Sequence, residues 1–255
     1  MAARQPGPHG RIVTVTAARA GCGKTTLVTN MAAAIATRDR RVCVVDLDLT
    51  AGDAAPLLGV RPLHCVTEAT AMSGELVSGA VTTLVTPVRP RLDAVLTRAV
   101  PGRTLSELVT VELLAGLARL YDYVVVDTPA RFSGHVLAAL DVAHHHVVAV
   151  TPDRPALRDL RLMLDMLDLL EGSAIPKSVV ANRFDPFAGL GPDEIEQTVK
   201  CSVAASLPST VDVVAAVNSG TPLVTAQPAH EYSRAVFRFV QEHITSVNEK
   251  GTTHA

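Results

Sequence analysis

The chain has 255 residues, of which 48% are apolar, and its formal net charge at pH 7 is −2. This composition is sufficient for a large buried core, and the near-neutral charge supplies no broad attraction for DNA or anionic lipid. No segment approaches the ~18 consecutive apolar residues of a membrane-spanning helix, and the first ten residues lack the apolar run of a signal peptide. We therefore expect a cytoplasmic protein whose four cysteines are reduced.

The predicted elements alternate between strand and helix. A β-branched run at Arg11–Thr16 precedes a glycine-containing loop and a helical pattern from about Lys24 to Thr37. The next apolar run, 41–48, is typical of a strand buried on both faces, because its valines are continuous rather than alternating. Further strands are expected at 92–97, 122–127, 146–151 and 177–182, and helices at about 105–119, 134–141, 156–171, 192–199 and 229–246. This order predicts an α/β fold with a doubly wound, mainly parallel sheet flanked by helices.

The predicted domain organisation is simple. A single domain is expected over 11–246, with a flexible leader at 1–10 and a flexible tail at 247–255. Residues 52–90 show the weakest periodicity, with a helix expected near 67–77. We interpret them as an insertion close to the sheet edge that carries the glycine-containing loop.

The stretch ARAGCGKTT, which begins at Ala18, has the features of a phosphate-binding loop. In such a loop backbone N–H groups surround a phosphate, a lysine reaches the β and γ oxygens, and the following hydroxyl binds Mg²⁺. Gly21, Gly23, Lys24 and Thr25 occupy these places. Ala18 replaces the first glycine of the standard pattern, but the loop follows a predicted strand and opens a helix, as the mechanism requires.

Polar residues end several of the other predicted strands. Asp46 and Asp48 end the second strand, Asp127 ends a central one and Asn182 ends the last. Each of them alone is compatible with an ordinary turn residue. Because the carboxyl ends of parallel strands share one edge, where open α/β sheets bind ligands, we expect these side chains to gather beside the phosphate loop.

At this point the sequence resembles the ParA/MinD family of P-loop ATPases, whose loop has the deviant form KGGxGKT. In this chain Arg19 stands for the characteristic lysine and Ala20 for the glycine beside it. Other similar segments are VVDLDLTAGD (44–53), YDYVVVDTPA (121–130), VTPDRPALRDLRLML (150–164), VVANR (179–183) and SLPSTVDVVAAVNSGTPLV (206–224). Within the family these segments are most similar to the CpaE/TadZ branch, which serves assembly and placement of Flp/Tad-type pili.

The resemblance implies ATP and Mg²⁺ as cofactors and assigns roles to single residues. Lys24 would bind the β and γ phosphates, and Thr25 would ligate Mg²⁺. Asp48 would orient or activate the attacking water, Asp46 would support the metal and its loop, and Asp127 would hold Mg²⁺ through water. These roles fit phosphoryl transfer, which depends on positioned charge and an in-line water.

The resemblance also implies how the nucleotide is held. Asn182 would read adenine, and the segment after Pro208 would close over the base. The nucleotide-contacting positions are then Ala20, Gly21, Cys22, Gly23, Lys24, Thr25, Thr26, Asn182, Arg183 and Pro208.

Arg19 joins Lys24 and Asp48 among the expected catalytic residues. In relatives the characteristic lysine crosses a dimer interface, so a homodimer is expected when ATP is bound. Arg19 keeps the charge but not the shape, because a guanidinium is planar and forked where an ammonium is a point charge. It is compatible with an arginine finger, with an ATP-holding dimer that does not hydrolyse, or with a solvated side chain. Ala20 would resist a positive φ.

The expected function is an ATP-dependent dimeric switch that recruits or positions a membrane-associated assembly of the Flp/Tad pilus, secretion or septum-site type. Its partner would be a protein, with recruitment to the inner face of the membrane or a cell pole but no direct membrane insertion. Three alternatives stay open: a non-catalytic scaffold, a DNA-segregating ATPase of ParA type, and a metabolic enzyme of the same fold.

Other patterns are given structural interpretations. Three adjacent histidines, 144 to 146, point to alternate faces and cannot converge on one metal ion. The last helix is expected to pack through a stripe that includes Phe237 and Val240, rather than to anchor a membrane. Arg154, Arg158 and Arg161 are interpreted as a solvated face paired with Asp159 and Asp165.

Overall fold

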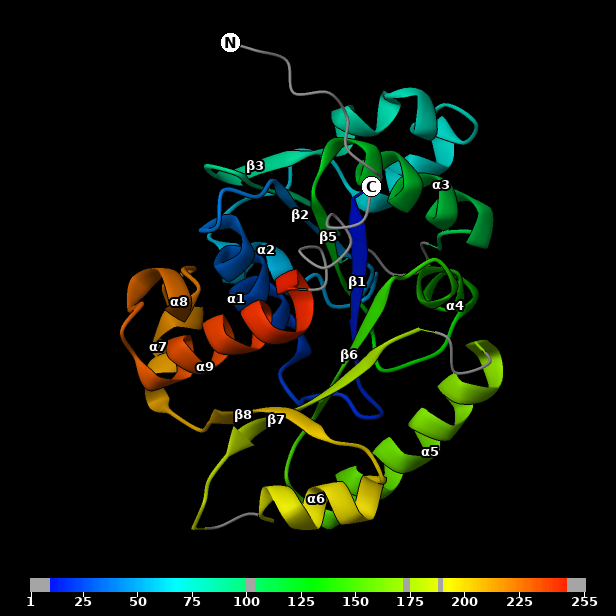
Figure 1. Cartoon of the computed structure of the whole chain (residues 1–255). Helices are drawn as coiled ribbons and strands as arrows, with labels where there is room; N and C mark the ends of the chain where they lie inside the picture. The colour runs from blue at the N-terminus through cyan, green and yellow to red at the C-terminus, as the bar shows by residue number, and fades with distance from the viewer. Residues whose placement is uncertain (1–9, 100–103, 172–174, 188–189, 247–255) are drawn as a thin grey trace, which may run out of the picture.

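A computed structural model of the chain describes residues 10–99, 104–171, 175–187 and 190–246. Within these residues eight strands form one sheet in the order β3-β4-β2-β5-β1-β6-β7-β8 (Figure 1). The strands are β1 (Arg11–Thr16), β2 (Val42–Asp46), β3 (Thr86–Arg89), β4 (Leu92–Val95), β5 (Tyr123–Asp127), β6 (His145–Val150), β7 (Lys177–Phe184) and β8 (Val203–Pro208). Every neighbouring pair is parallel except β3 and β4 at one edge. The predicted fold class is confirmed.

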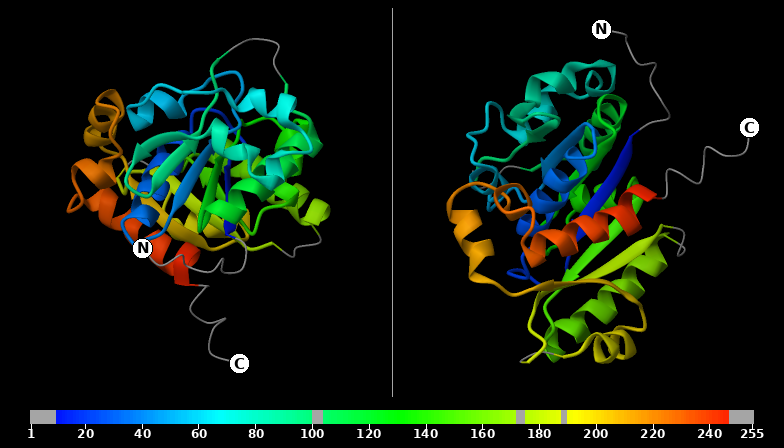
Figure 2. Two further views of the ribbon diagram at one scale, coloured as in Figure 1. Left: turned by 90° about the horizontal axis from the view of Figure 1, so that it is seen from above. Right: turned by 60° about the vertical axis from the view of Figure 1, so that its left-hand side comes forward.

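Helices cover both faces of this sheet (Figures 1 and 2). One face carries α1 (Lys24–Ala36), α2 (Ala54–Leu58), α7 (Val211–Asn218), α8 (Leu223–Ala226) and α9 (Glu231–Phe239), with π-helical turns at Val240–Thr245 after α9. The other face carries α3 (Glu107–Leu120), α4 (Gly134–Asp141), α5 (Arg154–Glu171) and α6 (Pro192–Val199). The segment between α2 and β3 adds three 3₁₀ pieces, Val66–Met72, Leu76–Ser78 and Ala80–Leu84.

The continuous valines of the central strands are explained by burial on both faces. In β5, Tyr123 and Val125 pack into the core beneath α1, whereas Val124 and Val126 pack into the core beneath α3. All four side chains are at most 1% exposed. Because successive side chains of a strand point to opposite faces, a strand covered on both sides needs apolar residues at every position.

Several predicted boundaries are wrong, and two of the differences concern the site. β2 ends at Asp46, so Leu47 and Asp48 lie in the following loop. β7 continues to Phe184, so Asn182 lies inside the strand rather than at its end. β7 is also not the last strand, because β8 follows it. The sequence of β8, VAASLP, has small, half-exposed residues and therefore shows little of the apolar pattern by which strands are recognised.

The interpretation of 52–90 as an insertion at the loop edge is wrong. Ala54 and Leu58 of α2 pack into the core beneath α1, whereas the 3₁₀ pieces contribute Val66, Leu76 and Leu84 to the core shared with α3, so the segment is built into both faces of the molecule. The region near 67–77 is 3₁₀ rather than α-helical.

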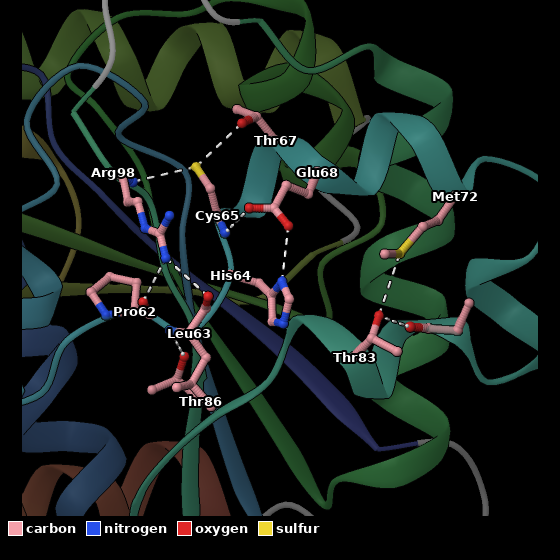
Figure 3. A network of polar contacts seen from close by, with 11 residues as sticks. Pro62, Leu63, His64, Cys65, Thr67, Glu68, Met72, Thr83, Thr86 and Arg98 are labelled. Carbon is pink, nitrogen blue, oxygen red and sulfur yellow. Dashed lines mark hydrogen bonds and ion pairs between the residues drawn. The ribbon is translucent and has the colours of Figure 1, made fainter.

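A network of polar contacts fastens the start of this segment to the end of β4 (Figure 3). The Arg98 guanidinium donates to the carbonyl oxygens of Pro62 and Leu63 at 2.8 and 2.9 Å. The Arg98 backbone N–H points to Cys65 Sγ at 3.4 Å, and the Cys65 N–H donates to Glu68 Oε1 at 2.9 Å. Side chains therefore replace the regular backbone ladder that the segment lacks.

The ends of the chain lie largely outside the described residues. This holds for the predicted tail and for all of the predicted leader except Gly10, whose N–H donates to Ala118 O at 2.6 Å. Among the helices of the described residues, none combines the length and the apolar character needed to cross a bilayer.

Candidate functional site

The phosphate loop joins the carboxyl end of β1 to the first turn of α1. Gly21 and Gly23 have φ of 80° and 86°, a left-handed conformation that side chains disfavour and that explains both glycines. Ala20 is not among the described residues with positive φ, so the expected resistance of an alanine there does not arise. The curl of the loop thus depends on two glycines that the sequence supplies.

Asn182 of β7 supports this loop from the side. Its Nδ2 donates to Cys22 O at 2.8 Å, and a Cβ added at Gly23 would lie only 2.3 Å from the same nitrogen. Asn182 is 5% exposed and Cys22 4%. In this structure the amide therefore holds the loop; its predicted contact with adenine stays a prediction.

The other positions expected near the base lie on the two neighbouring strands. Arg183 is exposed and has φ of 56°, and Pro208 ends β8 in register with Phe184. The Ser209 N–H closes this pairing by donating to Phe184 O at 2.9 Å. The structure therefore brings Arg183 and Pro208 to adjacent strand ends, although it does not test their contact with a base.

A buried carboxylate pair lies beneath the start of α1. The Thr25 hydroxyl donates to Asp127 Oδ2 at 2.6 Å, and the Asp48 N–H donates to Asp46 Oδ1 at 3.0 Å. The remaining oxygens, Asp127 Oδ1 and Asp46 Oδ2, are buried and have no hydrogen-bond partner among the described residues. Because unpaired buried carboxylate oxygens are costly, a cation that contacted these two oxygens would stabilise the pair.

The pKa values show the same lack of compensation. Burial raises the pKa of Asp127 to about 7; the hydroxyl of Thr25 and the charge of Lys24 oppose the rise. Burial, followed by the charge of Asp127, raises the pKa of Asp46 well above its usual range. Lys24 itself is only 9% exposed. The two carboxylates and one hydroxyl are the oxygen donors that Mg²⁺ prefers, so these residues fit the ion that the sequence implies.

Asp48 lies beside this pair but faces its own turn. Its Oδ1 accepts hydrogen bonds from Thr50 Oγ1 at 2.7 Å, Thr50 N at 3.3 Å and Ala51 N at 3.2 Å. The carboxylate is half-buried, and the loop that carries it ends at Gly52 with φ of 68°. In this conformation Oδ1 of Asp48 is engaged by its own turn, and the predicted role of this carboxylate toward water stays a prediction.

Arg19 is exposed but forms an ion pair within this chain. Its Nε donates to Asp159 Oδ2 of α5 at 2.6 Å, across a pair whose side chains are 51% and 37% exposed. Asp159 was expected to pair along its own helix; the helix pair that does form is Arg161 with Asp165. Arg19 also lines a cavity of about 310 Å³ between the phosphate loop, β6 and α5, to which Thr151, Asp153 and Arg183 contribute.

Two contacts near the site, made by Asp159 and His135, were missed by the sequence analysis. Asp159 binds Arg19 from 140 positions away, and no local pattern marks that pairing. His135, at the start of α4, contacts the carbonyl of Leu47 at 3.2 Å. The sequence did offer one signal for His135. It lies eight positions after Asp127, in the segment that leaves the carboxyl end of β5 and leads into α4, so a position near the site could have been expected.

Thr26 lies in the first turn of α1, where its carbonyl accepts from Asn30 Nδ2 at 2.8 Å. Its predicted contact with the nucleotide stays a prediction. The three histidines bond to neighbouring strands: His144 Nδ1 with Ile12 N at 3.1 Å, His145 Nε2 with Ser178 Oγ at 2.8 Å and His146 Nδ1 with Thr14 Oγ1 at 2.6 Å.

The buried stripe of the last helix differs slightly from the prediction. It consists of Tyr232, Val236, Phe239 and Val240, while Phe237 lies at its margin. The helix is nevertheless packed against the sheet, as expected.

The family model described as "CobQ/CobB/MinD/ParA nucleotide binding domain" matches residues 13–223. The septum site-determining protein MinD of Thermotoga maritima is 25% identical over 228 residues, which cover 84% of this chain and 81% of that protein. Its counterpart from Pyrococcus horikoshii, solved with Mg-ADP, superposes with a TM-score of 0.80 at 17% identity and covers 96% of this chain and 100% of its own. A ParA family ATPase from Chlorobium tepidum gives 0.83 at 22% identity, with 90% and 96% covered.

The matched region contains the phosphate loop, the carboxylate pair and Asn182. The expected cofactors are therefore confirmed at the level of the family, whereas the CpaE/TadZ branch stays a prediction. The chain belongs to the CobQ/CobB/MinD/ParA nucleotide binding domain family, and the MinD structure from Pyrococcus horikoshii that it resembles contains Mg-ADP.

Proposed function

We propose that this chain hydrolyses ATP and acts as a dimeric switch that positions a membrane-associated assembly. The observation that carries the proposal is the buried pair Asp46 and Asp127, each with an unpaired oxygen, beside Lys24 and Thr25. Such a pair is unfavourable by itself and becomes favourable when a cation and a polyphosphate arrive. The site is therefore arranged so that ligand binding releases strain.

In the proposed mechanism each residue has a separate task. The N–H groups from Gly21 to Thr25 and the Lys24 ammonium would bind the phosphates, while Thr25 and Asp127 would hold Mg²⁺, which supplies charge neutralisation at the transferring group. Asp48 would leave its turn and orient the attacking water. Arg19 would exchange Asp159 for the phosphates of a second subunit.

The mechanism is tested by measuring phosphate release and nucleotide-dependent sedimentation of the purified chain. We expect turnover and a dimer with Mg-ATP, and loss of both in Lys24→Ala. Arg38→Ala, which removes a side chain bonded to Gln241 at the other edge of the sheet, is the matched control. Absence of ATP binding by the wild-type chain would refute the proposal.

A second candidate is a scaffold that binds ATP and dimerises without hydrolysis. Two contacts favour the scaffold. Arg19 is bonded to Asp159, and the carboxylate of Asp48 is bonded within its own turn. The same experiment separates the two, because a stable ATP-bound dimer that releases no phosphate is the outcome for the scaffold alone.

For the assembly, we propose placement of a Flp/Tad-type pilus, with placement of the division septum as the alternative. The pilus is supported by the segments VVDLDLTAGD and AVNSGTPLV, and the septum by the printed name of the Thermotoga maritima relative. Recruitment to the inner face of the membrane would then occur through a partner protein. Deleting the coding sequence in its host distinguishes the two proposals. Loss of surface pili would support placement of a pilus, and misplaced septa would support placement of the septum. A deletion strain with normal pili and normal septa would refute both.

DNA segregation is a weaker alternative, for which the Arg154, Arg158 and Arg161 helix is the relevant surface. Arg161 is engaged by Asp165 and by Val199 O at 2.8 Å, which leaves less charge for phosphates. ATP-dependent, salt-sensitive binding to nonspecific DNA would support this alternative, and no binding at low salt would exclude it.

A further inference from the structure

His135 connects the segment after β5 to the loop after β2. Its Nε2 lies 3.2 Å from Leu47 O, and Ser133 Oγ lies 3.2 Å from Nδ1 and 3.4 Å from Nε2. Because a carbonyl oxygen can only accept, Nε2 must carry the proton, which leaves Nδ1 to accept from the Ser133 hydroxyl. One neutral tautomer therefore satisfies both contacts.

The position and charge state of this imidazole are fixed by its surroundings. Gly134 packs so closely against α3 that an added Cβ would lie 2.5 Å from Glu107 Oε1, which locates the first turn of α4. Burial lowers the pKa of His135 although Leu47 O and Asp48 favour the charged form. The N-terminus of a helix further disfavours an imidazolium, so the ring is a neutral donor near pH 7.

Leu47 is the residue through which this contact reaches the site. Its N–H donates to Asp127 O at 2.9 Å, its side chain is fully buried, and its carbonyl accepts from His135. It stands between Asp46, which has an unpaired oxygen in the carboxylate pair, and Asp48, which begins the turn. The backbone of Leu47, between Asp46 and Asp48, is thus held by Asp127 at its N–H and by His135 at its carbonyl.

We propose that His135 is a positioning residue that sets the turn at Asp48 by holding Leu47 O, and so couples the segment after β5 to the segment after β2. The role assigned to Asp48 rests on the proposed function. The coupling itself rests on the two hydrogen bonds of Leu47. A movement at 131–135 on nucleotide binding would then be transmitted to Asp48 without any contact between His135 and the nucleotide.

The test compares two substitutions of His135 in the full chain. His135→Ala removes the donor, whereas His135→Gln keeps an amide nitrogen at a reach similar to that of Nε2. His243→Ala, which removes an imidazole stacked on Phe239, is the matched control. The first readout is backbone amide exchange of the nucleotide-free protein at Asp48, Ala51 and Gly52, whose N–H groups bond within the turn.

We expect exchange of these amides to be about five- to tenfold faster in His135→Ala, as for loss of one buried hydrogen bond, and near wild type in His135→Gln and His243→Ala. The second readout is ATP turnover, for which kcat should fall about five- to tenfold in His135→Ala while the Kd for Mg-ADP stays within about twofold. Unchanged exchange in His135→Ala, or equal effects of Ala and Gln, would overturn the proposal. If the wild-type chain releases no phosphate, hydrolysis fails as a function, and the exchange result still decides the coupling.

Discussion

The two edges of the sheet hold buried polar side chains under opposite conditions. At the carboxyl edge Asp46 and Asp127 each keep a buried oxygen that has no hydrogen-bond partner in the described part of the chain. At the amino edge the buried His145 and His146 each bond to a neighbouring strand; among the described residues only Nδ1 of His145 finds no partner on these two rings. An unpaired nitrogen on a neutral ring costs much less than an unpaired oxygen on a carboxylate. The comparison teaches that the number of buried polar groups does not mark a site, whereas uncompensated charge does.

The largest expected effect concerns the amino edge and its response to pH. Burial lowers the pKa of His145 and of His146 to about 4. Between about pH 6.5 and pH 4 the unfolded chain therefore binds more protons than the folded one, so the free energy of unfolding decreases as the pH falls. The loss is up to about 3 kcal/mol for each histidine. Urea unfolding at pH 7 and pH 4.5 measures it.

A variant isolates this effect from that of the carboxylates, whose raised pKa values act with the opposite sign. His146→Asn keeps an acceptor near Thr14 but cannot titrate, so its unfolding free energy should depend less on pH than that of the wild type. Identical pH slopes for the two proteins would show that His146 does not contribute.

The next effect distinguishes the two glycines of the phosphate loop. Gly23→Ala combines a positive φ with a Cβ that would lie 2.3 Å from Asn182 Nδ2, so we expect a loss of about 2 kcal/mol or more in stability. Gly21 has a similar φ but open space around its Cβ, so Gly21→Ala should cost only about 1 kcal/mol. Urea unfolding of both variants gives the difference, and equal losses would mean that Asn182 does not constrain the loop.

A smaller effect, of opposite sign, is expected at the carboxyl edge. Asp127→Asn removes one of two buried acidic groups and keeps an acceptor for Thr25, so the nucleotide-free protein should gain on the order of 1 kcal/mol at pH 8. Binding of Mg-ATP should weaken tenfold or more in the same variant. Thermal unfolding and calorimetric titration measure the two quantities.

The control is Asp122→Asn at the amino edge, where a partly compensated carboxylate accepts from Arg41 N at 2.8 Å. This variant should be no more stable than the wild type. A loss of stability in Asp127→Asn would contradict the view that the carboxylate pair is strained.

The smallest effect on stability is expected for the exposed pair at the rim of the site. Asp159→Ala should change the free energy of unfolding by less than about 1 kcal/mol, because the pair is largely exposed to solvent. It releases Arg19, so an ATP-dependent dimer should form at a lower protein concentration in sedimentation experiments. Asp165→Ala, which breaks the Arg161 pair of the same helix, should leave dimerisation unchanged. If both variants dimerised to the same extent, Arg19 would not contribute to formation of the dimer.

The features that the sequence predicted well are those with a local signature. Continuous valines identified the strands that are covered on both faces, and a loop with Gly21, Gly23 and Lys24 between a strand and a helix identified the phosphate loop. α4 and α6 were placed with correct bounds. Adjacent carboxylates followed from topology, because parallel strands end at one edge.

The features that were missed depend on contacts between distant residues. Nothing near Asn182 indicates that its amide bonds to Cys22, 160 positions earlier, and nothing near Asp159 indicates Arg19. β8 was missed because a half-exposed edge strand needs few large apolar residues. The 3₁₀ segment after α2 has no period of its own and is held by side chains such as Arg98.

The contact between Asn182 and the phosphate loop has a consequence for portability. A nine-residue loop with two left-handed glycines looks like a cassette that could be grafted onto any strand and helix. Here its shape is completed by an amide from a strand on the far side of β6. A transplant that carries residues 18–26 alone would leave the Cys22 carbonyl without its donor, so the smallest transferable unit includes β1, β6 and β7.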